Sequence, residues 1–290
     1  MKFSIIIVFK NSEKTLERCL DSIVRQKYDN IEVIMVDSDS TDSSMQIIEK
    51  FKDVIPIKCF NSHIGGVGQA RNVGINNITG DYVLFLDSDD FFLEGLFDTL
   101  NERLLSDLKN IDIVRFNAKK IVYSETSEYE LNKYFMTEIP KTPTKEMFIL
   151  FDKYNIEFGP LWLYCYNSHF IKENNFVFLN DYMHEDLLND YILSCAKYLA
   201  NINYTGYCYV KSETNATSKK SNEQELFRVK SIIANYDYVV GLLKSKLKDR
   251  DFFDIRKKTL DACLIYDKKY FSDYVLDYYN KEVNIRLKGE

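Results

Sequence analysis

The sequence predicts an α/β fold in which a mostly parallel, mixed sheet is covered by helices on both faces. Short apolar runs of strand length recur along residues 3–90, and segments with apolar residues at helical spacing lie between them. This alternation is typical of βαβ units, whose strands are parallel and buried on both faces. The chain has 290 residues, enough for one large domain with a substantial appendage.

The first predicted elements follow one another as strand and helix. The run "SIIIVF" (Ser4–Phe9) is a continuous apolar segment of strand length. From Leu16 to Val24, apolar residues then recur at i, i+3, i+4, i+7 and i+8, which indicates an amphipathic helix. The next strands are expected at Ile31–Val36, Val54–Phe60 and Tyr82–Leu86, and the next helices at Met45–Phe51 and Ala70–Asn77.

The pattern changes in the second half of the chain. "DIVRFNAKKIVY" predicts a pair of strands, and the polar segment Ser124–Pro143 predicts a loop or insertion. "INYTGYCYV" predicts a late strand. Helices are expected at Lys145–Tyr154, Asp186–Lys197, Glu223–Leu247 and Asp251–Tyr279. The polar run "KSETNATSKKSNEQE" places a boundary between a first domain, residues 1–220, and a C-terminal helical extension, residues 221–290.

Composition excludes several classes of protein. A net charge of -6 and a pI of about 5.3 argue against nucleic acid as a partner. No apolar run reaches the roughly 18 residues of a membrane span, and the first strand is too short for a signal peptide. The six cysteines form no CxxC pair, so we expect buried free thiols in a reducing compartment. These features predict a cytoplasmic protein.

Two acidic triplets follow predicted strands. Asp37–Asp39 comes directly after "IEVIMV", and Asp87–Asp89 comes directly after "YVLFL". The ligands of parallel α/β sheets bind beyond the carboxyl ends of the strands, so we expect both triplets at one edge of the sheet. Carboxylates at the edge of a core are costly unless a cation accompanies them. The pattern therefore points to a site that binds a cation.

Other kinds of site fit the sequence less well. A calcium loop starting at Asp37 would need glycine and glutamate where Asp42 and Ile48 stand. "GGVGQARNVG" matches a dinucleotide fingerprint only in part, the histidines are too scattered for zinc, and no GxSxG elbow hosts a nucleophilic serine. Mg²⁺ or Mn²⁺, which take one or two carboxylates together with phosphates, fit best. Capping of the following helix by Asp89 and Asp90 is the alternative.

At these motifs the chain resembles the inverting family 2 glycosyltransferases of bacterial polysaccharide and lipooligosaccharide synthesis, which have the Rossmann-like GT-A fold. The likeness is dense over residues 3–100 and can be traced to about residue 210. The matching stretches are "SIIIVFKN", "LERCLDSIVRQKY", "IEVIMVDSDSTD", "GVGQARNVGI" and "GDYVLFLDSDD". The resemblance implies a UDP-sugar as donor and Mn²⁺ or Mg²⁺ as cofactor.

The resemblance also implies a role for individual residues. Asp37 would bind the uracil base, and Arg71 would face the nucleotide. The pocket for base and ribose would be lined by Val8, Phe9 and Asn11. In the DxD region, Asp87, Ser88 and Asp89 would contact ribose and metal, with Asp87 and Asp89 as the metal ligands and Asp89 the closest. The alternatives are that Asn11 and Asp37 are turn residues and that Arg71 is a surface ion-pair partner.

A family member also needs a base that deprotonates the acceptor hydroxyl. "MHEDLL" resembles the family's acidic pair before a helix, which implies Asp186 as the base with Glu185 in support; a capped helix start is the alternative. His184 beside this pair is either a residue near the metal or incidental. Trp162 resembles a family tryptophan near the acceptor, although a tryptophan is as often part of the core.

The sequence thus predicts a metal-dependent, inverting transfer of a sugar from a UDP-sugar to a hydroxyl of a glycan or lipid-linked acceptor. A sugar nucleotidyltransferase and a non-catalytic nucleotide-sugar binding protein remain as alternatives. Departures from the family pattern at Val8, Lys10, Ser38 and Asp39 leave base selectivity and acceptor open. Residues 241–290 carry +3 and several tyrosines, so we also consider contact with the inner membrane face or a homodimer.

Overall fold

The computed structural model describes residues 1–63, 66–123, 128–131, 136–153, 160–179, 186–211, 221–267 and 271–288. Within these ranges, ten strands form one mixed sheet with the main order β3-β2-β1-β4-β9-β6-β10-β5, while β7 pairs with β6 and β8 with β10. The sheet is α/β as predicted. No helix in the described ranges is long and apolar enough to cross a membrane.

The amino-terminal half of the sheet is parallel. Its strands are β1 (Phe3–Phe9), β2 (Ile31–Asp37), β3 (Ile57–Asn61) and β4 (Tyr82–Phe85), with β1 at the centre between β2 and β4. The connecting helices are α1 (Leu16–Val24), α2 (Ser44–Phe51) and α3 (Val67–Asn76). β1, β2 and β4 are almost fully buried, as expected for strands covered on both faces.

The other half of the sheet is largely antiparallel. The segment predicted as a strand pair is one long strand, β6 (Ile113–Tyr123), which runs parallel to β10 (Tyr198–Lys211). Two strands, β7 (Glu128–Leu131) and β8 (Ile139–Pro143), occupy part of the segment predicted as loop. β5 (Phe91–Phe92) and β9 (Tyr164–Asn167) were not predicted, and β9 pairs antiparallel with both β4 and β6. These short strands lack a periodic signal of their own.

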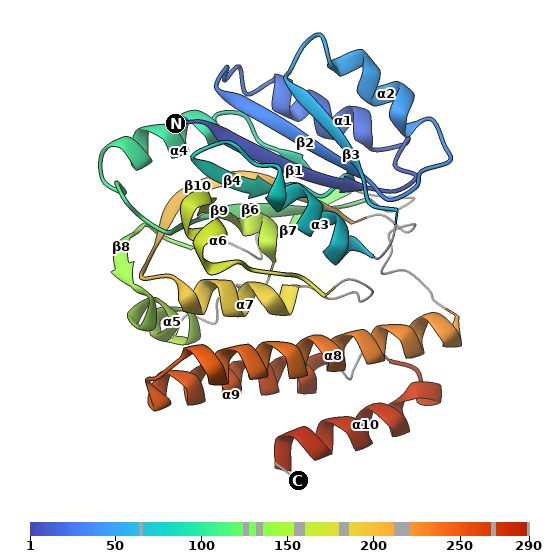
Figure 1. The fold of residues 1–290 in the computed structure, drawn as a ribbon, viewed down its shortest axis with the longest axis vertical. Helices are drawn as coiled ribbons and strands as arrows, with labels where there is room; N and C mark the ends of the chain where they lie inside the picture. The colour runs from blue at the N-terminus through green and yellow to red at the C-terminus, as the bar shows by residue number, and fades with distance from the viewer. Residues whose placement is uncertain are drawn as a thin grey trace.

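Helices lie in layers around the sheet (Figure 1). α1 and α2 lie on one side, and α3, α6 (Ser168–Asn174) and α7 (Asp186–Cys195) lie on the other. Beyond α7, a further layer contains α8 (Asn222–Lys246) and α9 (Arg250–Asp267), and α10 (Asp273–Lys288) packs on both. The predicted helix at Asp251–Tyr279 is therefore two helices. The other helices in the described ranges are α4 (Leu96–Leu105), α5 (Thr144–Lys153) and the 3₁₀ turn η1 (Leu161–Leu163).

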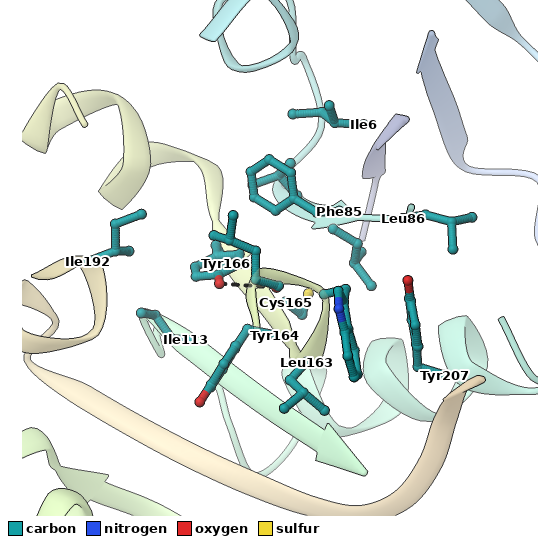
Figure 2. Close-up of a cluster of buried hydrophobic side chains, with 14 of the residues drawn as sticks. Ile6, Phe85, Leu86, Ile113, Leu163, Tyr164, Cys165, Tyr166, Ile192 and Tyr207 are labelled. Carbon is teal, nitrogen blue, oxygen red and sulfur yellow. Dashed lines mark hydrogen bonds between the residues drawn. The ribbon is translucent and has the colours of Figure 1, made fainter. Parts of the chain in front are cut away.

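One continuous hydrophobic core joins the sheet to its helices. Figure 2 shows the centre of this core. There the rings of Phe85 of β4 and Tyr166 of β9 meet edge to face, with their centroids 5.8 Å apart, and Ile192 of α7 lies close by. The described ranges contain five free cysteines, of which Cys19, Cys165 and Cys208 are buried and Cys59 and Cys195 are half-buried. The packing fixes the carboxyl ends of β1, β2 and β4, where the acidic triplets lie.

Candidate active site

Strand register brings the two acidic triplets to a common edge. Asp37 ends β2 and pairs with Phe9 of β1 on one side and Asn61 of β3 on the other. Asp87 follows β4, which is the neighbour of β1 on its opposite side. The two triplets therefore flank the end of β1, as the sequence predicted from parallel strand order.

Asp37 is held by its own turn. Its Oδ1 accepts hydrogen bonds from the backbone nitrogen of Ser40 at 3.0 Å and from the Ser40 hydroxyl at 2.6 Å. The backbone nitrogen of Ser62 donates to the Asp37 carbonyl at 2.8 Å. The residue is 8% exposed. An aspartate whose first oxygen is fixed in this way presents its second oxygen in a defined direction at the sheet edge.

Asn11 joins two loops. Its Oδ1 accepts from the backbone nitrogen of Thr41 at 2.8 Å, and its own backbone nitrogen donates to the Ser40 hydroxyl at 3.0 Å. Its φ of 50° lies in the left-handed region that asparagine tolerates better than most residues. A turn role for Asn11 was one of the alternatives considered from the sequence, but its contact with a second loop was not predicted. It sets the distance between the loop after β1 and the loop after β2.

The same two loops are joined at three further points. Glu13 donates from its backbone nitrogen to Asp42 at 3.0 Å, and its carboxylate accepts from the backbone nitrogen of Ser43 at 3.0 Å. The Ser44 hydroxyl accepts from the backbone nitrogen of Ser12 at 2.9 Å. Burial alone would raise the pKa of Asp42, but hydrogen bonds from Ser44 and Glu13 outweigh it and lower that pKa. The loops after β1 and β2 are thus held together beside the carboxyl end of β1.

The two other expected pocket residues lie at the end of β1. The Phe9 ring is 2% exposed and belongs to the core, while its carbonyl accepts from the backbone nitrogen of Ser38 at 3.0 Å. Val8 is half-buried against the same core. The Phe9 side chain is therefore part of the core.

The acidic loop (Asp87–Asp90) lies on the opposite side of β1. The guanidinium of Arg71, on α3, lies 3.2 Å from Asp87 Oδ1 and is almost fully buried. The hydroxyls of Ser88 and Ser12 are 2.9 Å apart, which joins the acidic loop to the loop after β1. Arg71 and Asp87 thus form an ion pair, and Ser88 lies beside them in the acidic loop.

Asp89 is partly buried beside Asp87. Burial, and then the neighbouring Asp87 carboxylate, raises the pKa of Asp89 to about 6. Two acids that repel each other in this way favour a divalent cation between them. In the described ranges no three metal-ligating side chains cluster, so a protein cage for a metal is absent there. A pair of carboxylates still fits Mg²⁺ or Mn²⁺, which complete their shell with phosphate and water.

Asp90 has a role that the sequence did not indicate. It is fully buried; its Oδ2 accepts from the Tyr207 hydroxyl and its Oδ1 from the backbone nitrogen of Val210, both at 2.7 Å. Burial, and then the Asp87 and Asp89 charges, raises the pKa of Asp90. Because α4 begins at Leu96 after Gly95, neither Asp89 nor Asp90 caps that helix. Asp90 instead ties the acidic loop to β10.

Tyr207, which binds Asp90, is itself held by an aromatic stack. Trp162 of η1 packs face to face on Tyr207, with ring centroids 4.4 Å apart, and is almost fully buried. The Tyr207 hydroxyl also accepts from the backbone nitrogen of Asp87 at 3.3 Å. Arg18 donates to the Asp89 carbonyl and lies over the Phe91 ring at 5.4 Å. Trp162 is therefore a core residue beneath the acidic loop.

The expected base lies at the start of α7. The helix begins at Asp186, as predicted, and this position fits both a base and a capped helix start. Glu185 and His184 lie outside the described residues. The first turn continues into Leu188, Tyr191 and Ile192, which are buried in the core and anchor the helix as expected.

Comparison with known proteins was made at the levels of family, sequence and structure. The family model described as glycosyl transferase family 2 matches residues 4–169. The glycosyltransferase GlyG of Streptococcus pneumoniae is 34% identical over 134 residues, which cover 46% of this chain and 42% of that protein. The poly(ribitol-phosphate) beta-N-acetylglucosaminyltransferase TarS of Staphylococcus aureus is 40% identical over 95 residues, which cover 31% and 17%. The chain thus spans less than half the length of these relatives.

A solved structure shares the fold over the whole chain. The crystal structure of residues 1–349 of S. aureus TarS in complex with UDP-GlcNAc superposes with a TM-score of 0.65 and covers 100% of this chain and 93% of that one. The sequences are 19% identical over this superposition, so the likeness concerns the fold. That fold is GT-A, as the sequence predicted.

Proposed function

The chain belongs to glycosyltransferase family 2, and from this premise we propose that it transfers a sugar from a UDP-sugar to a hydroxyl group of a glycan or lipid-linked acceptor. The observation that carries the proposal is the convergence of Asp37, Arg71, Asp87 and Asp89 around the end of β1. This edge is where a parallel α/β sheet binds nucleotides. The TarS complex contains UDP-GlcNAc, which supports a UDP-sugar as donor.

Each residue near β1 then has a chemical task. Asp37 accepts a hydrogen bond from the N–H of the uracil ring with its second carboxylate oxygen. The loops joined by Asn11 enclose the base and ribose together with Val8, the Phe9 backbone and Ser88. Arg71 stays paired with Asp87 and holds this carboxylate toward the diphosphate. Asp87 and Asp89 would hold Mn²⁺ or Mg²⁺, which neutralises the charge of the departing UDP when bound.

Asp186 acts on the acceptor. As the first residue of α7, it takes the proton from the acceptor hydroxyl, with Glu185 beside it in the sequence. The oxygen then attacks the anomeric carbon from the side opposite the diphosphate, so the configuration of the sugar inverts. Proton removal by a positioned carboxylate contributes about 100-fold or more to such reactions.

The test is release of UDP from defined donors. UDP-GlcNAc and UDP-glucose are the first donors to use, because relatives carry the names beta-N-acetylglucosaminyltransferase and beta-glucosyltransferase. With Mn²⁺ and poly(ribitol phosphate) or a short glycan as acceptor, the wild type should release UDP. The variant Asp186→Asn should lose at least about 100-fold of this rate while keeping its affinity for UDP.

A control variant removes an acid from the first turn of another helix, so that loss of catalysis can be separated from loss of helix stabilisation. Asp98 is an exposed acid in the first turn of α4, whose Phe97 packs on Phe3 at the far end of β1. Asp98→Asn should leave UDP release unchanged. No UDP release by the wild type with any donor would overturn the proposed function. Full activity of Asp186→Asn would overturn the role of Asp186, and UDP binding without turnover would favour a binding protein.

A further inference from the structure

Two neighbouring polar side chains fasten α7 to two different layers of the molecule. Asn189 is fully buried and accepts a hydrogen bond at its Oδ1 from the Tyr166 hydroxyl of β9 at 2.7 Å. Asp190 is also buried and forms an ion pair with Arg256 of α9. One residue therefore holds the helix against the sheet and the next holds it against the C-terminal helices.

The ion pair between Asp190 and Arg256 is buried in the protein and is not a surface contact. The side chains of Arg256 and Asp190 are 2% and 5% exposed. The Arg256 guanidinium lies 3.5 Å from the centroid of the Phe148 ring on α5, so α5 also fixes its position. Buried ion pairs contribute little net stability compared with apolar packing, and their best-attested use is to specify one arrangement. Here the arrangement specified is that of α7.

Helix geometry transmits this arrangement to the start of α7. Successive residues of an α-helix are about 100° apart around its axis, so anchors at Asn189 and Asp190 point to different layers and fix the rotation of the helix. They also fix its position along the axis. The backbone of Asp186 lies four residues before that of Asp190, about one helical turn away along the axis. Any rotation or shift at Asp190 therefore moves the backbone of Asp186 by a similar amount.

We propose that Asn189, Asp190 and Arg256 are positioning residues that aim Asp186 at the acceptor hydroxyl. Through Arg256, the C-terminal helical region becomes part of the catalytic unit rather than an appendage that only binds partners. This inference rests on the proposed function, in which Asp186 is the base. It predicts a defect in turnover that leaves the nucleotide site intact, because Asp37, Arg71 and the acidic loop belong to other elements.

The experiment uses two variants of the ion pair in the full chain. Arg256→Met removes the guanidinium and leaves Asp190 buried without its cationic partner. The double variant Asp190→Leu with Arg256→Met replaces the pair by apolar side chains, an exchange that proteins often tolerate without loss of stability. The control is Tyr236→Phe, which removes the 2.5 Å hydrogen bond from Tyr236 of α8 to Asp261 of α9, a bond that involves no residue of α7. All are compared with the wild type.

Three readouts are measured: the affinity for UDP with Mn²⁺, kcat and KM for UDP-GlcNAc or UDP-glucose, and amide hydrogen exchange of the first turn of α7. We expect kcat of both ion-pair variants to fall by about 100-fold, because a small misplacement far from the chemistry can have this effect. KM for the donor and the affinity for UDP should stay unchanged. Exchange in the first turn of α7 should rise in both ion-pair variants, and Tyr236→Phe should match the wild type in all three.

The outcomes separate the two proposals. If the wild type neither binds UDP nor releases it from a donor, the proposed function is wrong and the inference fails with it. If the wild type is active and the folded double variant keeps its kcat, the inference alone is overturned. An equal loss of kcat in Tyr236→Phe would also overturn it, since any weakening of the helical layer would then suffice. Should Arg256→Met fail to fold, the double variant alone carries the test.

Discussion

Replacing Glu32 by glutamine tests how the amino-terminal edge of the sheet is held together. Glu32 lies on β2, and its side chain is 3% exposed. Its carboxylate accepts hydrogen bonds from the Ser4 hydroxyl at 2.6 Å, from the Thr79 hydroxyl at 2.8 Å and from Lys58 at 3.0 Å. Through these bonds Glu32 joins β2 to β1, β3 and the turn before β4. A neutral amide cannot accept at all these positions.

The size of the effect follows from the pKa. Burial alone would raise the pKa of Glu32, but hydrogen bonds from Ser4, Thr79 and Lys58 outweigh it and lower the pKa from 4.5 to about 2. This difference corresponds to about 3 kcal/mol of folding free energy. Because the pKa is lower in the folded state, the contribution is complete above pH 4.5 and is lost as the pH falls toward 2.

The assay is urea unfolding of the wild type and Glu32→Gln at several pH values. At neutral pH we expect the variant to unfold with a free energy about 3 kcal/mol lower than the wild type, and this difference should shrink steadily below about pH 4.5. The control Glu49→Gln removes a carboxylate that is 57% exposed and paired with Lys52, so its effect should stay below about 1 kcal/mol. A difference for Glu32→Gln that is the same at neutral and acid pH would refute this reasoning.

Three further substitutions test the packing. In Gly74→Ala the new Cβ would lie 2.5 Å from Ile6 Cγ2, so the free energy of unfolding should fall by about 1–3 kcal/mol; an unchanged melting temperature would contradict the tight packing of α3 on β1. In Gly241→Ala, on α8, no atom lies within 4 Å, so thermal unfolding should show a gain of up to about 1 kcal/mol, and a loss would contradict the open position. Tyr207→Phe removes the hydroxyl that binds Asp90 and the Asp87 backbone, so it should lower stability by about 1–3 kcal/mol and weaken UDP binding with Mn²⁺; calorimetry and denaturation that both match the wild type would show that the tie is unnecessary.

The parallel half of the fold could be predicted from the sequence because each of its elements carries its own periodic signal. The apolar run Ser4–Phe9 and the pattern from Leu16 to Val24 identify a strand and a helix without reference to the rest of the chain. The common edge of the acidic triplets then follows from the rule that ligands bind beyond the carboxyl ends of parallel strands. These predictions are confirmed by the register of β1, β2 and β4.

The antiparallel half depends on partners that are distant in sequence. β9 has four residues and gains its place only by pairing with β4 and β6, and β5 has two residues that pair with β10. No local pattern distinguishes such strands from loops. The break between α9 and α10 was missed because both helices share the same mixture of aromatic and charged residues.

Within the candidate site, residue types were easier to predict than contacts. Asp87 and Asp89 stood out because carboxylates at the edge of a core are costly unless a cation accompanies them. The tie of Asp90 to Tyr207 spans 117 positions, and the ion pair of Asp190 with Arg256 spans 66. The ion pair of Asp190 with Arg256 could have been suspected from one feature of the sequence. Asn189 and Asp190 are polar residues in an otherwise apolar helix, so they need buried polar partners.

The central claim is that the acidic loop binds the diphosphate of a nucleotide together with a divalent cation. Calorimetric titration of UDP into the wild type and into Asp89→Ala, each with and without Mn²⁺, tests it most directly, with Asp98→Ala as a control for an acid on a remote helix. We expect UDP binding that requires Mn²⁺ in the wild type and the control and is lost in Asp89→Ala. Equal binding without metal, or no binding at all, would contradict the assignment of this loop.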